Sequence, residues 1–135
     1  MDLIVDTNSI LSALIKDSAA RKIIFKSGFR FYAPETIIKE IFSHLELIGG
    51  KTGFAEAEIQ TLAHFIASYF TTVPRSKYED FILQATALVP HPEDFQFIAL
   101  ALAIPNDGIW TADKHFAKQN KVKVWKTQEL LKFIK

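Results

Sequence analysis

The chain has 135 residues, of which 49% are hydrophobic and 23% charged, and its formal net charge is +1. This composition is typical of one globular domain spanning residues 1–135, and it excludes an intrinsically disordered chain. The absence of cysteine excludes disulfides, thiolate zinc sites and cysteine nucleophiles. It also fits a cytoplasmic protein. We expect no membrane association, because no apolar run reaches the roughly 18 residues that cross a bilayer and the N-terminus lacks a signal-peptide pattern.

The first half of the chain reads as alternating strands and helices. Leu3 to Val5 form a short apolar run that ends at Asp6, which is typical of a buried parallel strand followed by a helix cap. Further along, apolar residues at helical spacing, or residues that cap helices, predict helices. A stretch in which aromatic residues alternate with others predicts one strand. In chain order these are helices over 10–15 and 18–26, the latter stopped by Gly28, a strand over 29–33, and a helix over 34–48 ended by Gly49 and Gly50.

The second half repeats this alternation after a short Gly-rich stretch at 49–53, which is too brief to separate domains. We expect helices over 54–70, 76–88, 93–104, 114–118 and 127–134, and strands over 71–73, 109–111 and 122–125. The helix over 93–104 is apolar almost all round, which indicates burial. Five short strands separated by helices predict an α/β fold with a parallel sheet.

In open parallel sheets, ligands bind beyond the carboxyl ends of the strands, where the strand order reverses. Two acids, Asp6 and Asp113, follow predicted strands directly. Each could instead cap the next helix, although Asn8 and Ser9 could take over that capping from Asp6. Thr111, two residues before Asp113, is placed to orient that acid.

Two further acids belong to predicted helices. Glu40 falls on the shoulder of an apolar stripe, from which a side chain can reach a cleft, and the alternative is a surface glutamate. Asp94 begins the buried helix, where a helix cap is the alternative. Clustered carboxylates repel one another unless a cation neutralises them. All-oxygen ligands favour Mg²⁺ or Mn²⁺, which can activate water for phosphodiester hydrolysis.

The ordered set of motifs resembles the PIN-domain family of nucleases. The matching segments are Val5-Asp6-Thr7-Asn8, Pro34 followed by Glu40, Asp94-Phe-Gln-Phe-Ile-Ala99-Leu-Ala101, and Ile109-Trp-Thr111-Ala-Asp113-Lys-His-Phe116. The resemblance implies a three-layer α/β/α sandwich with a five-stranded parallel sheet in the order 3-2-1-4-5. It also implies Mg²⁺- or Mn²⁺-dependent cleavage of single-stranded RNA. Many small members are VapC-type toxins paired with an antitoxin protein, and many form homodimers.

On this resemblance, Asp6, Glu40, Asp94 and Asp113 are expected to be the catalytic and metal-binding residues. Asn8 and Thr111 are expected to orient Asp113 and the attacking water. The chain departs from the family at His115, because members often carry a further acid at that position. A non-catalytic module that binds RNA or protein through a weakened site therefore stays open as an alternative.

The charge distribution is uneven. Residues 114–135 carry seven lysines and one glutamate, a net charge of +6, so the remainder of the chain carries −5. A basic segment beside an acidic site suits a nuclease, and we expect Lys114 and Lys118 to contact RNA phosphates. The alternative is a solvated lysine-rich edge.

Three other sites are disfavoured. The four histidines show no helical pair, which argues against a histidine-based zinc site. Lys51-Thr52 lacks the spacing of a phosphate-binding loop. The position two residues after Asp6 is Asn8, whereas a phosphatase of the haloacid-dehalogenase type would have a second aspartate there.

Overall fold

The computed structural model describes residues 1–7, 9, 11, 18–37, 39–40, 55–89, 91 and 94–134. Its centre is a sheet of five strands, all paired in parallel, in the order β3-β2-β1-β4-β5. The strands are β1 (Asp2–Val5), β2 (Arg30–Pro34), β3 (Phe70–Val73), β4 (Ile109–Trp110) and β5 (Val124–Trp125). The predicted α/β class and the strand order 3-2-1-4-5 are confirmed.

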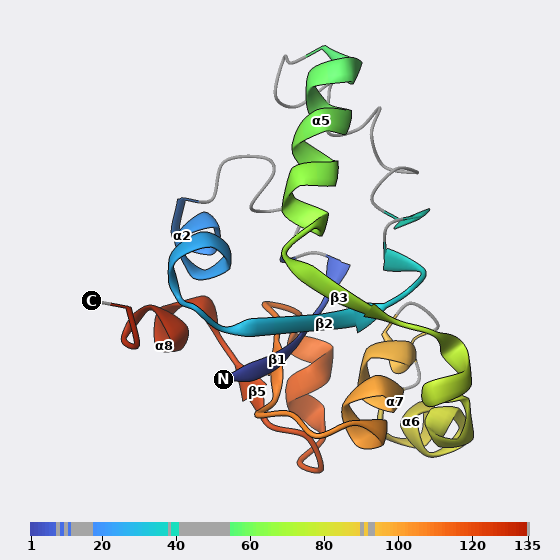
Figure 1. The fold of residues 1–135 in the computed structure, drawn as a ribbon. Helices are drawn as coiled ribbons and strands as arrows, with labels where there is room; N and C mark the ends of the chain where they lie inside the picture. The colour runs from blue at the N-terminus through green and yellow to red at the C-terminus, as the bar shows by residue number, and fades with distance from the viewer. Residues whose placement is uncertain are drawn as a thin grey trace.

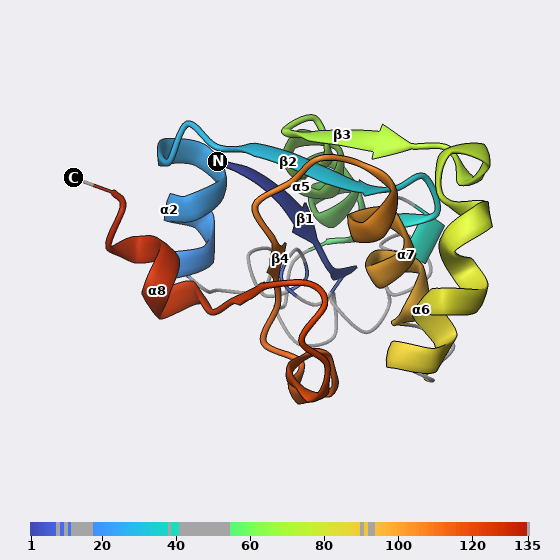
Figure 2. The same cartoon turned by 90° about the horizontal axis from the view of Figure 1, so that it is seen from below.

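Helices lie on both faces of this sheet. Figure 1 shows α2 (Ser18–Lys26) and α5 (Glu56–Ala67) on one side, and α6 (Ile82–Leu88) and α7 (Phe95–Ala103) on the other. From below, α2 lies beside α8 (Thr127–Leu131) and α6 lies beside α7, at opposite ends of the molecule (Figure 2). Among the described residues, no helix is both long and apolar enough to cross a membrane.

The core forms where the apolar runs of the sequence meet. All three apolar residues of β1, Leu3 to Val5, are fully buried, as expected of the central strand of a sheet covered on both faces. Five consecutive residues of α7, from Phe97 to Ala101, are buried, so this helix is enclosed on nearly all sides, as its sequence predicts. Phe31 contacts Trp110 across the sheet with ring centroids 5.9 Å apart.

Several predicted boundaries were wrong. Pro34 ends β2 instead of starting a helix, because it pairs with Val73 of β3, and the next N–H, that of Glu35, donates to the Val73 carbonyl at 3.0 Å. Phe70 starts β3, so the predicted helix over 54–70 ends at Ala67. Residues 41–48 and the linker at 49–53 lie outside the described residues.

The later elements are shorter than predicted. Two 3₁₀ turns, η1 (Arg75–Lys77) and η2 (Glu79–Phe81), occupy the first part of the expected helix over 76–88. The strand expected over 122–125 is reduced to β5, and the last helix ends at Leu131. Residues 114–118 form a 3₁₀ helix, η3 (Lys114–Lys118). Strong helical spacing alone does not fix where a helix ends, since tertiary contacts decide its last turns.

The strand order determines where a site can form. The chain places β2 and β3 on one side of β1, then returns to place β4 and β5 on the other side. The carboxyl ends of β1 and β4 therefore flank the point where the order reverses. Because α7 leads into β4 and both β1 and β4 are parallel, α7 must run against the strands, and its N-terminus lies at their carboxyl edge.

Candidate active site

Asp6 is a buried carboxylate at the end of the central strand. It directly follows β1 and is only 3% exposed. Its Oδ1 accepts the Ser9 N–H at 2.9 Å, and its Oδ2 accepts the Thr111 hydroxyl. Burial raises the pKa of Asp6 and the charge of Asp113 adds to this rise, while the hydrogen bonds from Thr111 and Ser9 lower the pKa. Asp6 therefore caps the following turn through Oδ1, which is the helix-capping role named above as the alternative. Its Oδ2 instead binds Thr111, which directly follows the neighbouring strand β4.

Thr111 links Asp6 to Asp113. It follows β4, is 2% exposed, and donates its hydroxyl to Asp6 while accepting the Asp113 N–H at 3.0 Å. Asp113 in turn accepts the His115 N–H at 2.9 Å, which caps η3. One hydroxyl thus connects two acidic residues that are 107 positions apart in the chain, and the orienting role expected of Thr111 stays a prediction.

Asp94 lies beside Asp113 at the N-terminus of α7. It occupies the cap position of that helix, but its side chain makes no capping hydrogen bond there. The pKa of Asp94 is raised to about 6, chiefly by burial and then by the charge of Asp113 and a hydrogen bond to its side chain. His115 and His91 act in the opposite direction. A raised pKa of this kind is typical of carboxylates gathered for a function.

Glu40 is held next to Asp6 by two side chains. Its Oε2 accepts the hydroxyl of Thr7, the residue that follows Asp6, and its Oε1 accepts Gln96 Nε2 at 2.8 Å. Gln96 also contacts Thr36 at 3.0 Å. Gln96 was not predicted to belong to the site. Its signal in the sequence is that it is the single polar residue of the apolar helix α7.

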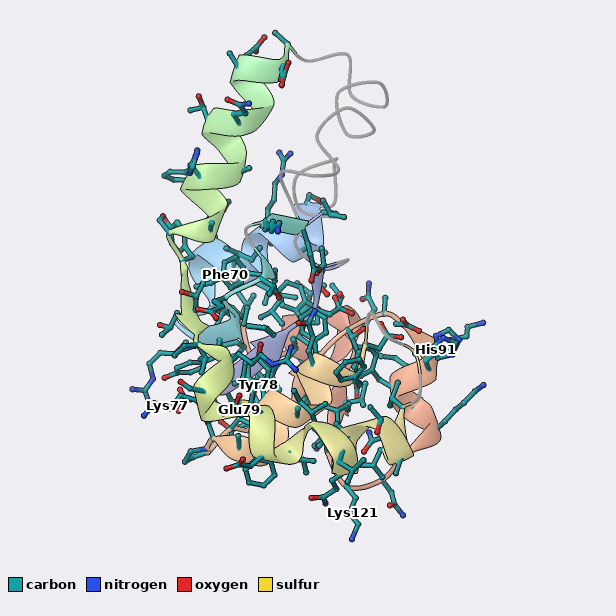
Figure 3. All side chains as sticks on the ribbon, turned by 90° about the vertical axis from the view of Figure 1, so that its right-hand side faces the viewer. Phe70, Lys77, Tyr78, Glu79, His91 and Lys121 are labelled. Carbon is teal, nitrogen blue, oxygen red and sulfur yellow. The ribbon has the colours of Figure 1, made fainter. Side chains whose placement is uncertain are left out.

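Two histidines approach the same acids. His115 Nδ1 lies 2.9 Å from Asp113 Oδ1 and 3.6 Å from Asp94 Oδ2. His91 stacks on His115 with ring centroids 3.9 Å apart and an angle of 28° between the planes. Figure 3 shows His91 at the surface of the molecule. This pair was not predicted, because the two histidines are 24 positions apart and only the tertiary structure brings them together.

The four predicted acids therefore form a chain of neighbours, not one tight ring. Asp94 is next to Asp113, Asp113 is linked to Asp6 through Thr111, and Asp6 is followed by the Thr7 that binds Glu40. Within the described ranges, no lysine or arginine forms an ion pair with Asp6, Asp94 or Asp113. Neighbouring acids repel one another unless a cation lies near them, and their oxygens suit Mg²⁺ or Mn²⁺.

Two of the remaining predicted residues lie beside this cluster. Lys114 and Lys118 are exposed on η3, immediately after Asp113. Asn8 lies outside the described residues, so its expected role stays a prediction. The cluster thus has one buried acid, Asp6, with half-buried acids beside it and exposed lysines on the adjoining turn.

The raised pKa of Asp94 predicts how stability depends on pH when no metal is added. Between its ordinary value of 3.8 and about 6, the folded state keeps the proton that the unfolded chain has lost. The stability contributed by Asp94 is therefore present below pH 3.8 and is lost as the pH rises through about 6. In chelator, Asp94→Asn should flatten the fall in Tm between pH 4.5 and 7.5.

Thermal melts across this pH range measure the effect. Asp80→Asn, which changes an exposed acid of η2, should leave the slope as it is in the unaltered protein. If Asp94→Asn and the unaltered protein have the same slope, the electrostatic account of Asp94 is wrong. Adding Mg²⁺ or Mn²⁺ at pH 7 should raise the Tm of the unaltered protein, since an ion that binds only the folded state stabilises it.

The sequence of this chain matches a known protein family. Residues 4–134 match a family model described as PIN domain, which covers almost the whole chain. No curated protein matches the sequence. A PIN domain indicates a nuclease, generally one that depends on divalent metal ions, and this agrees with a group of acids at the carboxyl edge of a parallel sheet. The sheet order, the ordered motifs and the family match lead to one conclusion: the chain belongs to the PIN-domain family.

Proposed function

We propose that this protein is a metal-dependent endoribonuclease that cleaves phosphodiester bonds of single-stranded RNA in the cytoplasm. The observation that supports it best is the linked set Asp6, Thr111, Asp113 and Asp94 at the point where the strand order reverses. Nuclease activity follows from the family, whereas RNA as the substrate and Mg²⁺ or Mn²⁺ as the ion are the finer part of the proposal.

The acids would hold the ion, with Asp6 and Asp113 as the principal ligands and Glu40 and Asp94 completing the negative cage. A bound divalent cation lowers the pKa of water and stabilises negative charge on a phosphate. The Thr111 hydroxyl donates to the Asp6 carboxylate and accepts the backbone N–H of Asp113, and so holds the two residues in a fixed relation. Thr7 and Gln96 use both oxygens of Glu40, and so hold its side chain in one orientation.

A fluorescent RNA oligomer incubated with Mg²⁺, with Mn²⁺ or with chelator tests the proposal. We expect cleavage with at least one of the two ions and none in chelator. Intact RNA with either ion, together with normal RNA binding, would favour the alternative of a non-catalytic RNA-binding module. A DNA oligomer of the same sequence tests the preference for RNA.

Lys114 and Lys118 are proposed to hold phosphates of the RNA. Both are exposed on η3, next to Asp113. Replacing both with alanine should weaken RNA binding and reduce the slope of log K against log salt by about 1.4, or about 0.7 for each lost phosphate contact with a single strand. Cleavage at saturating RNA should change little, because the acids are untouched.

Fluorescence anisotropy over a range of salt concentrations measures this slope. Lys22 and Lys26, two exposed lysines of α2, provide a matched double alanine control that should bind RNA normally. If the control loses as much affinity as the η3 variant, the basic contact is spread over the surface and the assignment to η3 is wrong.

We also propose a homodimer formed through two exposed aromatic side chains, Phe65 of α5 and Tyr69, which follows that helix. Phe65 and Tyr69 are 53% and 43% exposed, and both contact Phe25, with centroid distances of 5.6 and 4.9 Å. Figure 1 shows α5 extending beyond the sheet, where a second copy can reach it. An apolar patch of this kind is typical of a partner surface.

Sedimentation velocity at micromolar concentration should show a dimer that Phe65→Asp converts to a monomer. Leu83→Asp is the matched control, because Leu83 is 85% exposed on α6, and it should leave the dimer intact. A monomeric unaltered protein would contradict the proposal.

The finest part of the proposal is a role as the toxin of a toxin–antitoxin pair, a role that many small members of the PIN-domain family have. Such a role requires an antitoxin protein that binds this chain and suppresses its ribonuclease activity. We expect a neighbouring gene to encode a small DNA-binding protein. Its coexpression should relieve the growth arrest that expression of this chain alone causes.

A further inference from the structure

We infer that His91, Asp94 and His115 form a mixed nitrogen and oxygen metal site that binds Zn²⁺, or a similar first-row transition ion, in preference to Mg²⁺. The inference rests on the proposed function only in that Asp94 belongs to both groups of ligands. It goes beyond the proposed acidic site, because the ligands expected there are carboxylates alone, whereas two of the three ligands here are histidines.

The first support is geometric. Each of the three residues offers one ligand atom, and these atoms all lie within 4.8 Å of one another, a closeness that no other group of three or more such residues reaches in the described part of the chain. Bonds to Zn²⁺ are about 2.0–2.2 Å long and usually tetrahedral, so ligand atoms on one ion are separated by about 3.3–3.6 Å. Small side-chain movements are therefore enough to close the three around an ion.

The second support is the state of the His115 ring. Nδ1 of His115 is buried and, although it lies 2.9 Å from Asp113 Oδ1, it has no hydrogen-bond partner of acceptable geometry among the described residues. A buried polar nitrogen without a partner is costly, and structures retain one only for a reason. An ion near Asp94 and Asp113 would satisfy it.

The third support is the ligand chemistry of the three side chains. Two imidazoles beside a carboxylate make a ligand set that suits Zn²⁺, because imidazole nitrogen favours Zn²⁺ and other late transition ions. Mg²⁺ prefers oxygen ligands alone.

The ligand chemistry also predicts how the preference can be changed. Replacing one imidazole with a carboxylate makes the site richer in oxygen, so His115→Asp should weaken Zn²⁺ binding and strengthen Mg²⁺ binding. Removing either imidazole should lower Zn²⁺ affinity by at least about tenfold, since loss of even an outer partner of a metal ligand costs about 10–100-fold.

Calorimetric titration of the chelator-stripped full chain with Zn²⁺, and separately with Mg²⁺, measures these affinities. We expect Zn²⁺ to bind more tightly than Mg²⁺, and His91→Ala and His115→Ala each to lose at least about tenfold in Zn²⁺ affinity. His64→Ala is the matched control, because His64 lies on α5 outside the cluster, and it should bind Zn²⁺ as the unaltered protein does.

A measurement on the unaltered protein avoids any effect of substitution on folding. Zn²⁺ titration followed by NMR should move the ring nitrogen resonances of His91 and His115 at lower metal concentration than those of His64. Unchanged Zn²⁺ affinity in both alanine variants, or ring resonances of His64 that move as early as those of the pair, would overturn the inference. Zn²⁺ binding as expected without RNA cleavage in any metal would refute the proposed function and leave this site standing, while cleavage in Mg²⁺ without Zn²⁺ binding would do the reverse.

Discussion

Asp113→Asn protein should bind single-stranded RNA as well as the unaltered protein and cleave it at least about 100-fold more slowly. Metal ions contribute several kcal/mol to stabilising the charge that develops in the transition state, and each 1.36 kcal/mol corresponds to a factor of ten in rate. The side chain of Asp113 interacts with that of Asp94, and its backbone N–H donates to the Thr111 hydroxyl that binds Asp6, so Asp113 lies between the other two acids. An amide in its place removes a negative charge and one strong oxygen ligand.

The measurement is single-turnover cleavage of a labelled oligomer, with binding followed by anisotropy in chelator. Asp80→Asn removes the same charge from an exposed acid of η2 and should cleave normally. Cleavage that persists at the full rate in Asp113→Asn, and also in chelator, would indicate a contaminating nuclease or a mechanism without these acids. Asp6→Asn should behave as Asp113→Asn does.

Thr111→Val should cost about 1–3 kcal/mol of stability and slow cleavage by about 10–100-fold. Valine matches the shape of threonine but cannot donate to Asp6 or accept from the Asp113 N–H, so a buried carboxylate and an amide each lose a partner. The pKa of Asp6, already raised by burial, should rise further because the Thr111 hydrogen bond lowers it. Loss of an orienting partner typically costs 10–100-fold in metal affinity or activity.

Thr111→Ser should recover most of both losses, since serine keeps the hydroxyl. Thr86→Val provides the control, because Thr86 donates its hydroxyl to the Leu83 carbonyl on α6, away from the acids. Chemical denaturation gives the change in stability, and the cleavage assay gives the change in rate. A Thr111→Val protein that cleaves RNA at the full rate would show that the hydroxyl does not position the acids.

Most of the fold could be predicted from the local pattern of the chain. The run from Leu3 to Val5 is buried as the central strand, and the apolar helix α7 is enclosed by the core, because burial on both faces requires apolar residues in succession. Gly28 ends α2 with a φ of 74°, a conformation that glycine adopts without steric cost. Pro34 was misjudged because its pairing with β3 is a contact between residues far apart in sequence, which local preference does not contain.

The candidate site likewise has features that the sequence predicts and contacts that only the tertiary structure determines. The sequence by itself placed Asp6 and Asp113 directly after strands and Asp94 at the start of a buried helix, since strand ends and helix starts are local features. The catalytic role of these acids stays a prediction. Only the tertiary structure decided that Thr111 binds Asp6, that Gln96 binds Glu40, and that His91 stacks on His115 beside Asp94. Each of these contacts joins residues more than 20 positions apart, and only the parallel sheet, by bringing its strand ends to one edge, determines which of them meet.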